Sequence, residues 1–565
     1  MKSATNFLLL IFILIKAPVF SQEYYAPLDF RLLLSGTFGE LRANHFHTGI
    51  DIKTEGVEGQ KVYAIDKGYI SRIKISSWGY GKAIYINHPN GKTSVYAHLQ
   101  KLSDKIEDIV KKEHYKREQF EINFFPKKDA IMINKGEIIA LSGNSGGSNG
   151  AHLHFEIRDT KTEHPINPLK FDFLIDDNIA PTLKKIKIYA FDTTLINNKR
   201  KSKIIKIENE KNAYFIKDNL IINGAFGLGI FTYDKLNDSH NKNGVYSIEL
   251  FIDSVIHYAF KVDELDFSTK RYINAHIDYC EHKVSNNKYH RCYKLPHNKL
   301  NNYSDVVNNG IISFKDNNIH LITILVSDIA GNTSILNFNV QSNNKPFDRD
   351  EEYLESNHSA NFRLSSPNIF KTDNLQLYMH ANSLYEPLKF HYNITDTINE
   401  VYGSIHHVHN NTIPVHKRYT LSIKANIPNE LKEKTYIAST NMQGTYKYLG
   451  GNWQEGFLRA KIREFGNFCI VADTISPVIK AINIVNGKVL KTQNNIKCTI
   501  KDIDSGIKSF RGEINGNWIL MDYDYKRSLL KYDIDSDLEK GTHIFTLEVV
   551  DNVGNISNYK AKFTY

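Results

Sequence analysis

The chain has 565 residues, which at roughly 150 residues per domain suggests about four domains. Hydrophobic residues make up 41% and charged residues 24%, so the chain is too apolar to be disordered. Aromatic residues reach 12% while Pro numbers only 14, a balance that favours β-strands. The formal net charge of +9 is spread along the chain without a block of Lys or Arg, which excludes a typical nucleic-acid-binding arm.

The first 21 residues have the pattern of a secretory signal peptide. Lys2 precedes an apolar run over 7–15, which is much shorter than the ~20 residues that span a bilayer. Small residues precede Gln22, as at a cleavage site. We therefore expect residues 1–21 to be removed and the remainder to be periplasmic, in the cell envelope or secreted. A buried N-terminal strand is the alternative. No later stretch has the pattern of a transmembrane segment.

Four cysteines are too few for a disulfide framework in a chain of this size. Cys280 and Cys292 could close a short loop, and Cys469 and Cys498 could form a second bridge. Four cysteines allow three pairings, and the sequence does not choose among them.

Two parts of the chain repeat each other. The segment 177–186, with Pro181, matches 473–482, with Pro477. The segment 320–334 matches 543–557, and both contain an Asp-x-x-Gly-Asn turn between two apolar runs. These runs have the length of strands in an antiparallel sandwich.

The expected fold class is all-β, with an N-terminal β-domain and about three β-sandwich (Ig-like) domains. The boundaries that we predict are 22–175 for the N-terminal domain, 176–343 for an Ig-like sandwich with an insertion, 344–472 for a second β-rich sandwich, and 473–565 for a C-terminal Ig-like sandwich.

Two polar features of the downstream regions have competing explanations. The Asp-x-x-Gly-Asn turns could bind a cation, but an Asp in such a turn more often caps it, while Gly supplies a positive φ. On a strand, His407 and His409 would share one face, which makes a metal pair conceivable. No Cys or carboxylate stands near this pair in a convincing pattern, so we expect a surface or interface strand.

Residues 22–175 contain three histidine motifs in order. The motifs are His45-Phe46-His47-Thr48-Gly49-Ile50-Asp51, Tyr96-Ala97-His98-Leu99 and His152-Leu153-His154-Phe155-Glu156. Gly49 indicates that the first motif is a loop that runs into a strand. On a strand, His152 and His154 point to one side and their apolar neighbours to the other.

This combination of residues suits a hydrolytic zinc site. Such a site uses imidazole nitrogen and carboxylate oxygen as ligands and keeps one tetrahedral position for water. His47, Asp51 and one histidine of the last motif would supply three ligands. His98 and the other histidine of the pair could then orient and deprotonate the water and stabilise the oxyanion. As scattered structural histidines, the three motifs would have to coincide by chance.

The order of these motifs resembles that of the lysostaphin/LytM-type zinc endopeptidases of bacterial cell walls. The resemblance includes the run 136–146 before the last motif and Asn167-Pro168-Leu169 after it. It covers about 33–169, roughly a quarter of the chain. It implies a compact antiparallel β-domain with a groove across the sheet, a Zn²⁺ cofactor, and the peptide stems or cross-bridges of peptidoglycan as substrate. By this resemblance, the metal ligands are His47, Asp51 and His154, and the catalytic residues are His98 and His152.

Three features near these motifs have a functional and a structural interpretation. Residues 100–135 form an insertion relative to the family, and Ile106, Ile109 and Val110 predict a helix over 103–116. The insertion could line or cover the groove, or be a surface elaboration. Arg42 and His45 could support the first ligand, contact a stem carboxylate, or be loop residues. The Gly-rich run 142–150 leads into a strand and lacks Gly-Lys-Ser/Thr, so it does not predict a phosphate loop.

Two classes of function are compatible with the sequence. The first is a zinc-dependent endopeptidase that hydrolyses peptide bonds of peptidoglycan in cell-wall remodelling or lysis. The alternative is a non-catalytic cell-wall binding or regulatory protein that activates another hydrolase. The intact ligand set favours the enzyme. A secreted peptidase acting on glycine-rich protein would use the same chemistry. The sandwiches could bind an envelope protein as partner, and no nucleic acid is expected.

Overall fold

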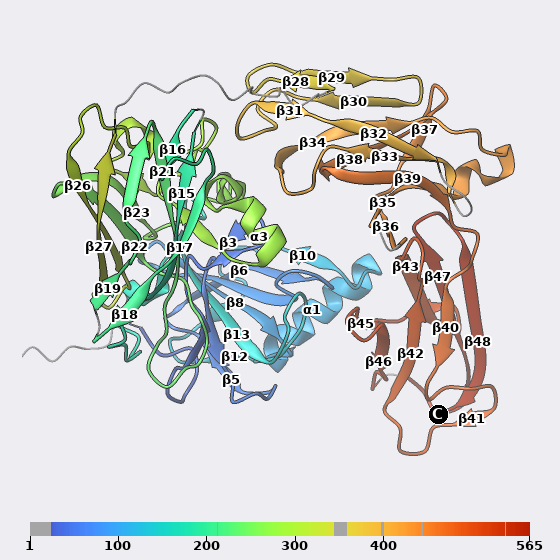
Figure 1. Cartoon of the computed structure of the whole chain (residues 1–565). Coiled ribbons are helices and arrows are strands. Elements are labelled where there is room, and N and C mark those ends of the chain that lie inside the picture. The colour runs from blue at the N-terminus through green and yellow to red at the C-terminus, as the bar shows by residue number, and fades with distance from the viewer. Residues whose placement is uncertain are drawn as a thin grey trace, which may run out of the picture.

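The computed structural model describes residues 24–191, 193–211, 213–343, 359–396, 401–441, 444–536 and 538–565 (Figure 1). The predicted signal peptide lies outside these residues. Antiparallel strand pairs predominate in the described part, which confirms the all-β fold class. In the described part of the chain, no helix has both the length and the apolar character needed to cross a membrane.

The N-terminal region is built on a nine-stranded sheet. Its central path is β1 (Leu34–Gly36), β4 (Ile50–Lys53), β13 (His152–Asp159), β8 (Lys92–Leu99), β7 (Lys82–Asn87), β6 (Gly68–Ile75) and β10 (Ile122–Phe124), with β11 (Met132–Ile133) on β6 and β14 (Pro165–Ile166) on β13. A three-stranded sheet contains β5 (Lys61–Tyr63), β12 (Ile138–Leu141) and β9 (Lys101–Leu102), and β2 (Leu41–Arg42) pairs with β3 (His45–Phe46). A short 3-10 turn, η1 (Pro168–Lys170), follows β14.

Strand β13 joins the core to the polar face of the sheet. Leu153, Phe155 and Ile157 are fully buried in the hydrophobic core of this region. Burying one such side chain is worth about 1.5–3 kcal/mol, so these three alternate residues fix which face of β13 points inward. His152 and His154 consequently lie together on the opposite face, as predicted.

The next region, after the linker at Pro181, has two sheets around a common core. One sheet contains β17 (Lys203–Lys206), β15 (Thr182–Ala190), β21 (Phe226–Tyr233) and β24 (Tyr289–Arg291). The other contains β16 (Leu195–Ile196), β20 (Leu220–Asn223), β27 (Thr333–Ser342), β26 (Ile319–Ser327), β22 (Ser247–Ile252), β23 (Val255–Lys261) and β25 (Tyr303–Ser304), with β18 (Glu208–Glu210) and β19 (Ala213–Phe215) at its side. The short helices are η2 (Lys270–Tyr272), α2 (Ile273–His276), α3 (Tyr279–Ser285) and η3 (Val307–Gly310).

The third region again has two five-stranded sheets with one core. The first sheet contains β29 (Asn368–Lys371), β30 (Leu375–Met379), β34 (Pro414–Ile423), β38 (Phe457–Glu464) and β37 (Asn452–Gln454). The second contains β32 (Tyr392–Asp396), β33 (Tyr402–Val408), β39 (Gly466–Ala472), β35 (Thr435–Thr440) and β36 (Tyr446–Tyr448). A further pair is β28 (Ala360–Phe362) with β31 (Leu388–Phe390), and η4 (Asn429–Lys434) precedes β35.

The C-terminal region has a four-stranded and a five-stranded sheet with one core. The four-stranded sheet contains β40 (Val478–Ala481), β42 (Asn495–Lys501), β46 (Leu529–Asp533) and β45 (Asp522–Asp524). The five-stranded sheet contains β41 (Lys488–Val489), β48 (Ile556–Thr564), β47 (Thr542–Asp551), β43 (Ile507–Ile514) and β44 (Asn517–Trp518).

The repeated sequences form equivalent structures. In the first repeat, the side chain of Asn332 donates hydrogen bonds to Asp328 Oδ2 at 2.8 Å and to the carbonyl oxygen of Asp177 at 3.2 Å. The C-terminal repeat has the same contacts, made by Asn555, Asp551 and Asp473. The Asp-x-x-Gly-Asn turn therefore ties the end of one strand to the linker that opens the unit.

The predicted helix in the insertion is present as α1 (Asp104–Arg117), with Ile106 and Val110 buried. It contacts the C-terminal region, which lies beside it in Figure 1. Tyr115 donates a hydrogen bond to Asp535, and Lys111 pairs with the same carboxylate. The insertion is therefore a docking element between two regions that are far apart in sequence.

The structure decides two questions about the downstream regions that the sequence left open. All four cysteines are free thiols, with Cys280 exposed and the others buried. His407 lies on β33, but that strand ends at Val408, and His409 has a φ of 55°. His407 binds Thr395 and Asn467, so the two histidines do not form a metal pair.

Candidate metal centre and active site

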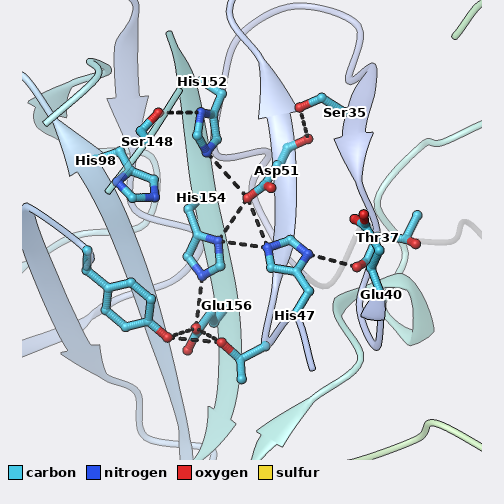
Figure 2. Close-up of polar contacts among 12 residues, drawn as sticks. Ser35, Thr37, Glu40, His47, Asp51, His98, Ser148, His152, His154 and Glu156 are labelled. Atoms are coloured by element: carbon cyan, nitrogen blue, oxygen red, sulfur yellow. Dashed lines mark hydrogen bonds and ion pairs between the residues drawn. The ribbon is translucent and has the colours of Figure 1, made fainter. Parts of the chain in front are cut away.

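Strand register brings the three predicted metal ligands together. In the antiparallel pairing of β4 with β13, Asp51 stands directly opposite His154. His47 lies in the loop between β3 and β4, four residues before Asp51. Figure 2 shows these three side chains pointing toward one another from the face of the sheet.

Three ligand atoms converge at this point. Asp51 Oδ1 is 3.0 Å from His47 Nε2 and 2.9 Å from His154 Nδ1, and the two ring nitrogens are 3.1 Å apart. All three side chains are buried. One atom from each residue lies within 4.8 Å of the other two, which is a separation that a single metal ion can bridge.

The second nitrogen of each ligand ring has a protein acceptor. His47 Nδ1 lies 2.8 Å from the carbonyl oxygen of Thr37, and His154 Nε2 lies 2.9 Å from Glu156 Oε1. Since carbonyl and carboxylate oxygens only accept hydrogen bonds, these ring nitrogens donate. The nitrogens that face Asp51 are therefore free to offer their lone pairs, as metal ligation requires.

The residues present fit a zinc ion. Two imidazole nitrogens and one carboxylate form the donor set of a catalytic zinc site, with a fourth position left for water or substrate. Without a cation, the centre attracts a proton instead. Burial lowers the pKa of His154, but hydrogen bonds to Asp51 and Glu156 outweigh burial and raise that pKa to about 9.

Asp51 is held in its charged form. Burial raises its pKa, but the charge of His47 and hydrogen bonds from His152 and His154 hold the pKa well below its ordinary value. Arg42 adds a hydrogen bond to Asp51 Oδ2 at 2.8 Å. Arg42 therefore supports the site. The ring of His45 instead contacts the carbonyl oxygen of Ala43 and is not part of the centre.

The two other predicted histidines lie beside the three ligand atoms. His152 Nε2 is 3.4 Å from Asp51 Oδ1, and the rings of His98 and His152 are 4.8 Å apart. His152 Nδ1 contacts the carbonyl oxygen of Gly150 at 2.9 Å, and His98 Nδ1 contacts that of Ser145 at 2.8 Å. In each ring Nδ1 donates to a backbone carbonyl, so in the neutral form of either ring Nε2 carries the lone pair.

His98 has two further unusual properties. Its φ is 59°, which a non-glycine residue adopts at a cost of about 1–3 kcal/mol and which often occurs at functional sites. Burial, together with repulsion from His154 and His152, lowers the pKa of His98 to about 3. The ring is therefore neutral at neutral pH and can both donate and accept a hydrogen bond.

A buried ionic network behind His154 was not predicted from the sequence. Glu156, which is 0% exposed, accepts hydrogen bonds from Thr48 at 2.5 Å, from Tyr80, and from Arg158 at 2.6 Å. Burial raises the pKa of Glu156, but Arg158 and His154 lower it below its ordinary value. The sequence does contain a signal for this network, because polar residues alternate from His152 to Arg158 on a strand whose other face is apolar.

Comparisons with known proteins agree with this geometry. Residues 45–115 match peptidase family M23. The chain contains a peptidase family M23 domain. Residues 359–473 match a Zu5-like domain, a more specific description than the second β-rich sandwich expected there.

The similarity to individual proteins is confined to the same part of the chain. The DD-carboxypeptidase/endopeptidase Mpg of Neisseria meningitidis is 34% identical over 123 residues, which are 22% of each protein. An uncharacterized metalloprotease of Haemophilus influenzae is 30% identical over 123 residues, 22% of this chain and 20% of that protein. The catalytic domain of lysostaphin from Staphylococcus simulans is 21% identical, over 25% of this chain and 90% of that one, with a TM-score of 0.19. The chain spans about a fifth of the length of the curated relatives it matches.

Metal analysis of single variants tests the assignment of ligands. We expect Asp51→Asn to lose most of the bound zinc, because the amide removes the negative charge shared by both imidazoles. His152→Ala should keep about one zinc per chain, since its ring is not among the three ligands. The measurement is zinc content by mass spectrometry after gel filtration, with His45→Ala as the matched control. Full zinc occupancy in Asp51→Asn would refute the ligand set.

The buried network predicts a second effect. Glu156→Gln removes the charge between Arg158 and His154, which leaves the guanidinium buried without its partner. Breaking such a pair costs on the order of 3–5 kcal/mol of unfolding free energy, and losing the acceptor for a ligand imidazole lowers metal affinity on the order of 10- to 100-fold. Urea unfolding and zinc titration measure the two effects. Glu163→Gln is the control, since its partly exposed carboxylate contacts the same arginine at 3.2 Å; equal losses in both variants would contradict the prediction.

Proposed function

We propose that the chain is a zinc-dependent endopeptidase that hydrolyses peptide bonds in the stems or cross-bridges of peptidoglycan. The observation that carries this proposal is the convergence of His47, Asp51 and His154 with two further histidines beside them. The M23 family match and the names of the relatives support a cell-wall substrate.

The residues of the site have separate parts in the proposed reaction. When bound by His47, Asp51 and His154, zinc would supply Lewis acidity that makes a water molecule nucleophilic near neutral pH. His152 Nε2 accepts the proton of the attacking water, because its Nδ1 is already bonded to Gly150. The neutral His98, whose Nδ1–H is bonded to Ser145, offers its Nε2 lone pair to the second proton of that water and so orients it. Once His152 is protonated at Nε2, that nitrogen donates a hydrogen bond to the developing oxyanion. The buried network of Glu156 and Arg158 keeps the ring of His154 in orientation.

A second candidate function is a non-catalytic wall-binding or regulatory protein that activates another hydrolase. A protein with that function would not require two further histidines, His98 and His152, beside an intact ligand set. The same site could also serve a secreted peptidase with a glycine-rich protein as substrate. Substrate identification separates these three functions.

The test uses the chain from residue 22 incubated with purified sacculi. We expect new stem or cross-bridge fragments, identified by mass, which vanish on zinc chelation and in His152→Ala. His45→Ala should cleave at the wild-type rate, because its ring lies outside the site. If zinc-loaded wild-type protein released nothing from any wall type, the endopeptidase would be excluded. Release that persisted in His152→Ala would refute the role of that residue.

A further inference from the structure

A second group of carboxylates lies outside the proposed zinc centre. Asp177 belongs to the linker before β15, Asp234 follows β21 directly, and Asp328 follows β26 directly. One oxygen from each of the three lies within 4.8 Å of the other two. Three separate segments therefore deliver negative charge to one end of the first sandwich.

No basic side chain neutralises this charge within the described residues, although Asp328 and Asp177 accept hydrogen bonds from Asn332 and from the backbone of Ile179. Among the ion pairs of the described residues, none includes any of these three carboxylates. Asp234 is only 2% exposed, and its Oδ1 atom has no hydrogen-bond partner. Burial, together with Asp177 and Asp328, raises the pKa of Asp234 to about 8. An unpartnered buried carboxylate oxygen is costly unless a cation binds it.

A small cavity adjoins the carboxylates. It has a volume of about 20 Å³, and all three aspartates line it, together with Thr37 and Asn167 of the M23 domain region. This is room for a single water-sized species. The donors are oxygen atoms, which hard cations such as Ca²⁺ prefer, whereas zinc favours nitrogen and sulfur ligands.

We propose that this cavity holds one calcium ion, ligated by Asp177, Asp234 and Asp328. The ion would sit where the first sandwich meets the M23 domain. Thr37 connects it to the zinc centre: its hydroxyl accepts a hydrogen bond from the backbone N–H of Gly244 at 3.1 Å, and its carbonyl oxygen holds the ring of His47. Calcium would therefore fix the junction on which one zinc ligand depends.

The C-terminal repeat offers an internal comparison. Asp473, Asp502 and Asp551 form the equivalent cluster, and Asp502 follows β42 as Asp234 follows β21. Here, however, Asp502 Oδ2 accepts a backbone hydrogen bond from Gly506 at 2.6 Å, and Asp473 Oδ2 accepts one from Ser505 at 3.1 Å. The equivalent aspartate is thus satisfied by the protein, and Asp502→Asn is the matched control for Asp234→Asn.

Calcium titration of the full, zinc-loaded chain tests this proposal. We expect wild-type protein and Asp502→Asn to bind one calcium ion at the first cluster and to unfold at a higher temperature when it is present. Asp234→Asn should bind it at least about tenfold more weakly, since a charged ligand becomes neutral. This variant should still fold without calcium, because the substitution also removes repulsion from the cluster.

Isothermal titration calorimetry and thermal unfolding, with and without calcium, give the two readouts. The proposal is overturned if wild-type protein binds no calcium, or if Asp234→Asn binds it as tightly as wild type. Loss of binding in Asp502→Asn alone would place the ion at the other cluster and equally overturn it.

A separate observation concerns the tip of the β45–β46 hairpin in the C-terminal region. The ring of Tyr525 stacks on Trp78 with centroids 3.6 Å apart. Lys526 Nζ donates hydrogen bonds to the carbonyl oxygens of Asn144 and, at 3.0 Å, Ser148. Ser148 in turn contacts His152 Nδ1 at 3.2 Å. The hairpin tip therefore lies on the loop that orients a proposed catalytic histidine.

We infer that this hairpin forms one wall of the substrate groove and restricts which peptides reach His152, an inference that rests on the proposed function. Lys82 anchors its base by pairing with Asp522 at 2.6 Å. Arg511, on β43 of the same region, makes a second contact by pairing with Glu118 at the end of α1 at 2.7 Å. A cross-linked strand of the cell wall is bulkier than a soluble muropeptide. The hairpin should therefore discriminate between these two substrates.

The test compares Tyr525→Ala/Lys526→Ala with a control pair of exposed residues in the same region, Ile503→Ala/Lys540→Ala. We expect the first pair to raise the cleavage rate of intact sacculi relative to soluble muropeptide several-fold, and the control pair to leave the ratio unchanged. An unchanged or lower ratio in the first pair, with cleavage intact, would overturn the inference about the hairpin. No cleavage of either substrate by any zinc-loaded protein would instead refute the proposed function.

Discussion

The structure depends on three ligand atoms with lone pairs that are buried close together at the proposed zinc centre. Asp51 and the facing nitrogens of His47 and His154 lie about 3 Å apart, where they repel one another unless a positive charge lies among them. Thr37 and Glu156 prevent relief of this repulsion by rotation, because each holds the far nitrogen of one ring. The protein therefore maintains a site whose stable state includes a cation, and this requirement explains the buried acceptors around it.

Strand β13 shows how one segment serves both folding and chemistry. Its inward residues fill the core, so the strand cannot slip by one residue without moving Leu153 and Phe155 into the polar face. The same constraint fixes the strand register that places His154 opposite Asp51. Hydrophobic packing thus determines the geometry of a polar site that it never touches.

The sequence predicted those parts of the site that depend on local order. Alternation placed His152 and His154 on one face, and motif order brought Asp51 and His47 to them. The helix α1 also followed from its spacing. The contact that α1 makes could not be predicted, because its partner Asp535 lies more than 400 residues away in the sequence. The cluster of Asp177, Asp234 and Asp328 was hidden for the same reason: only one of the three belongs to the Gly-Asn turn, and strand pairing supplies the rest.

The M23 domain and the first sandwich cannot be separated at the site. Phe46 immediately precedes the ligand His47, yet its ring is buried in the core of the sandwich, against Phe260 and His276. The hairpin of β2 and β3 is therefore anchored on both sides, by the sandwich through Phe46 and by the sheet through Asp51. Any loosening of that junction would move His47 relative to His154, so the geometry of the three proposed ligands depends on a core formed largely by residues of the first sandwich.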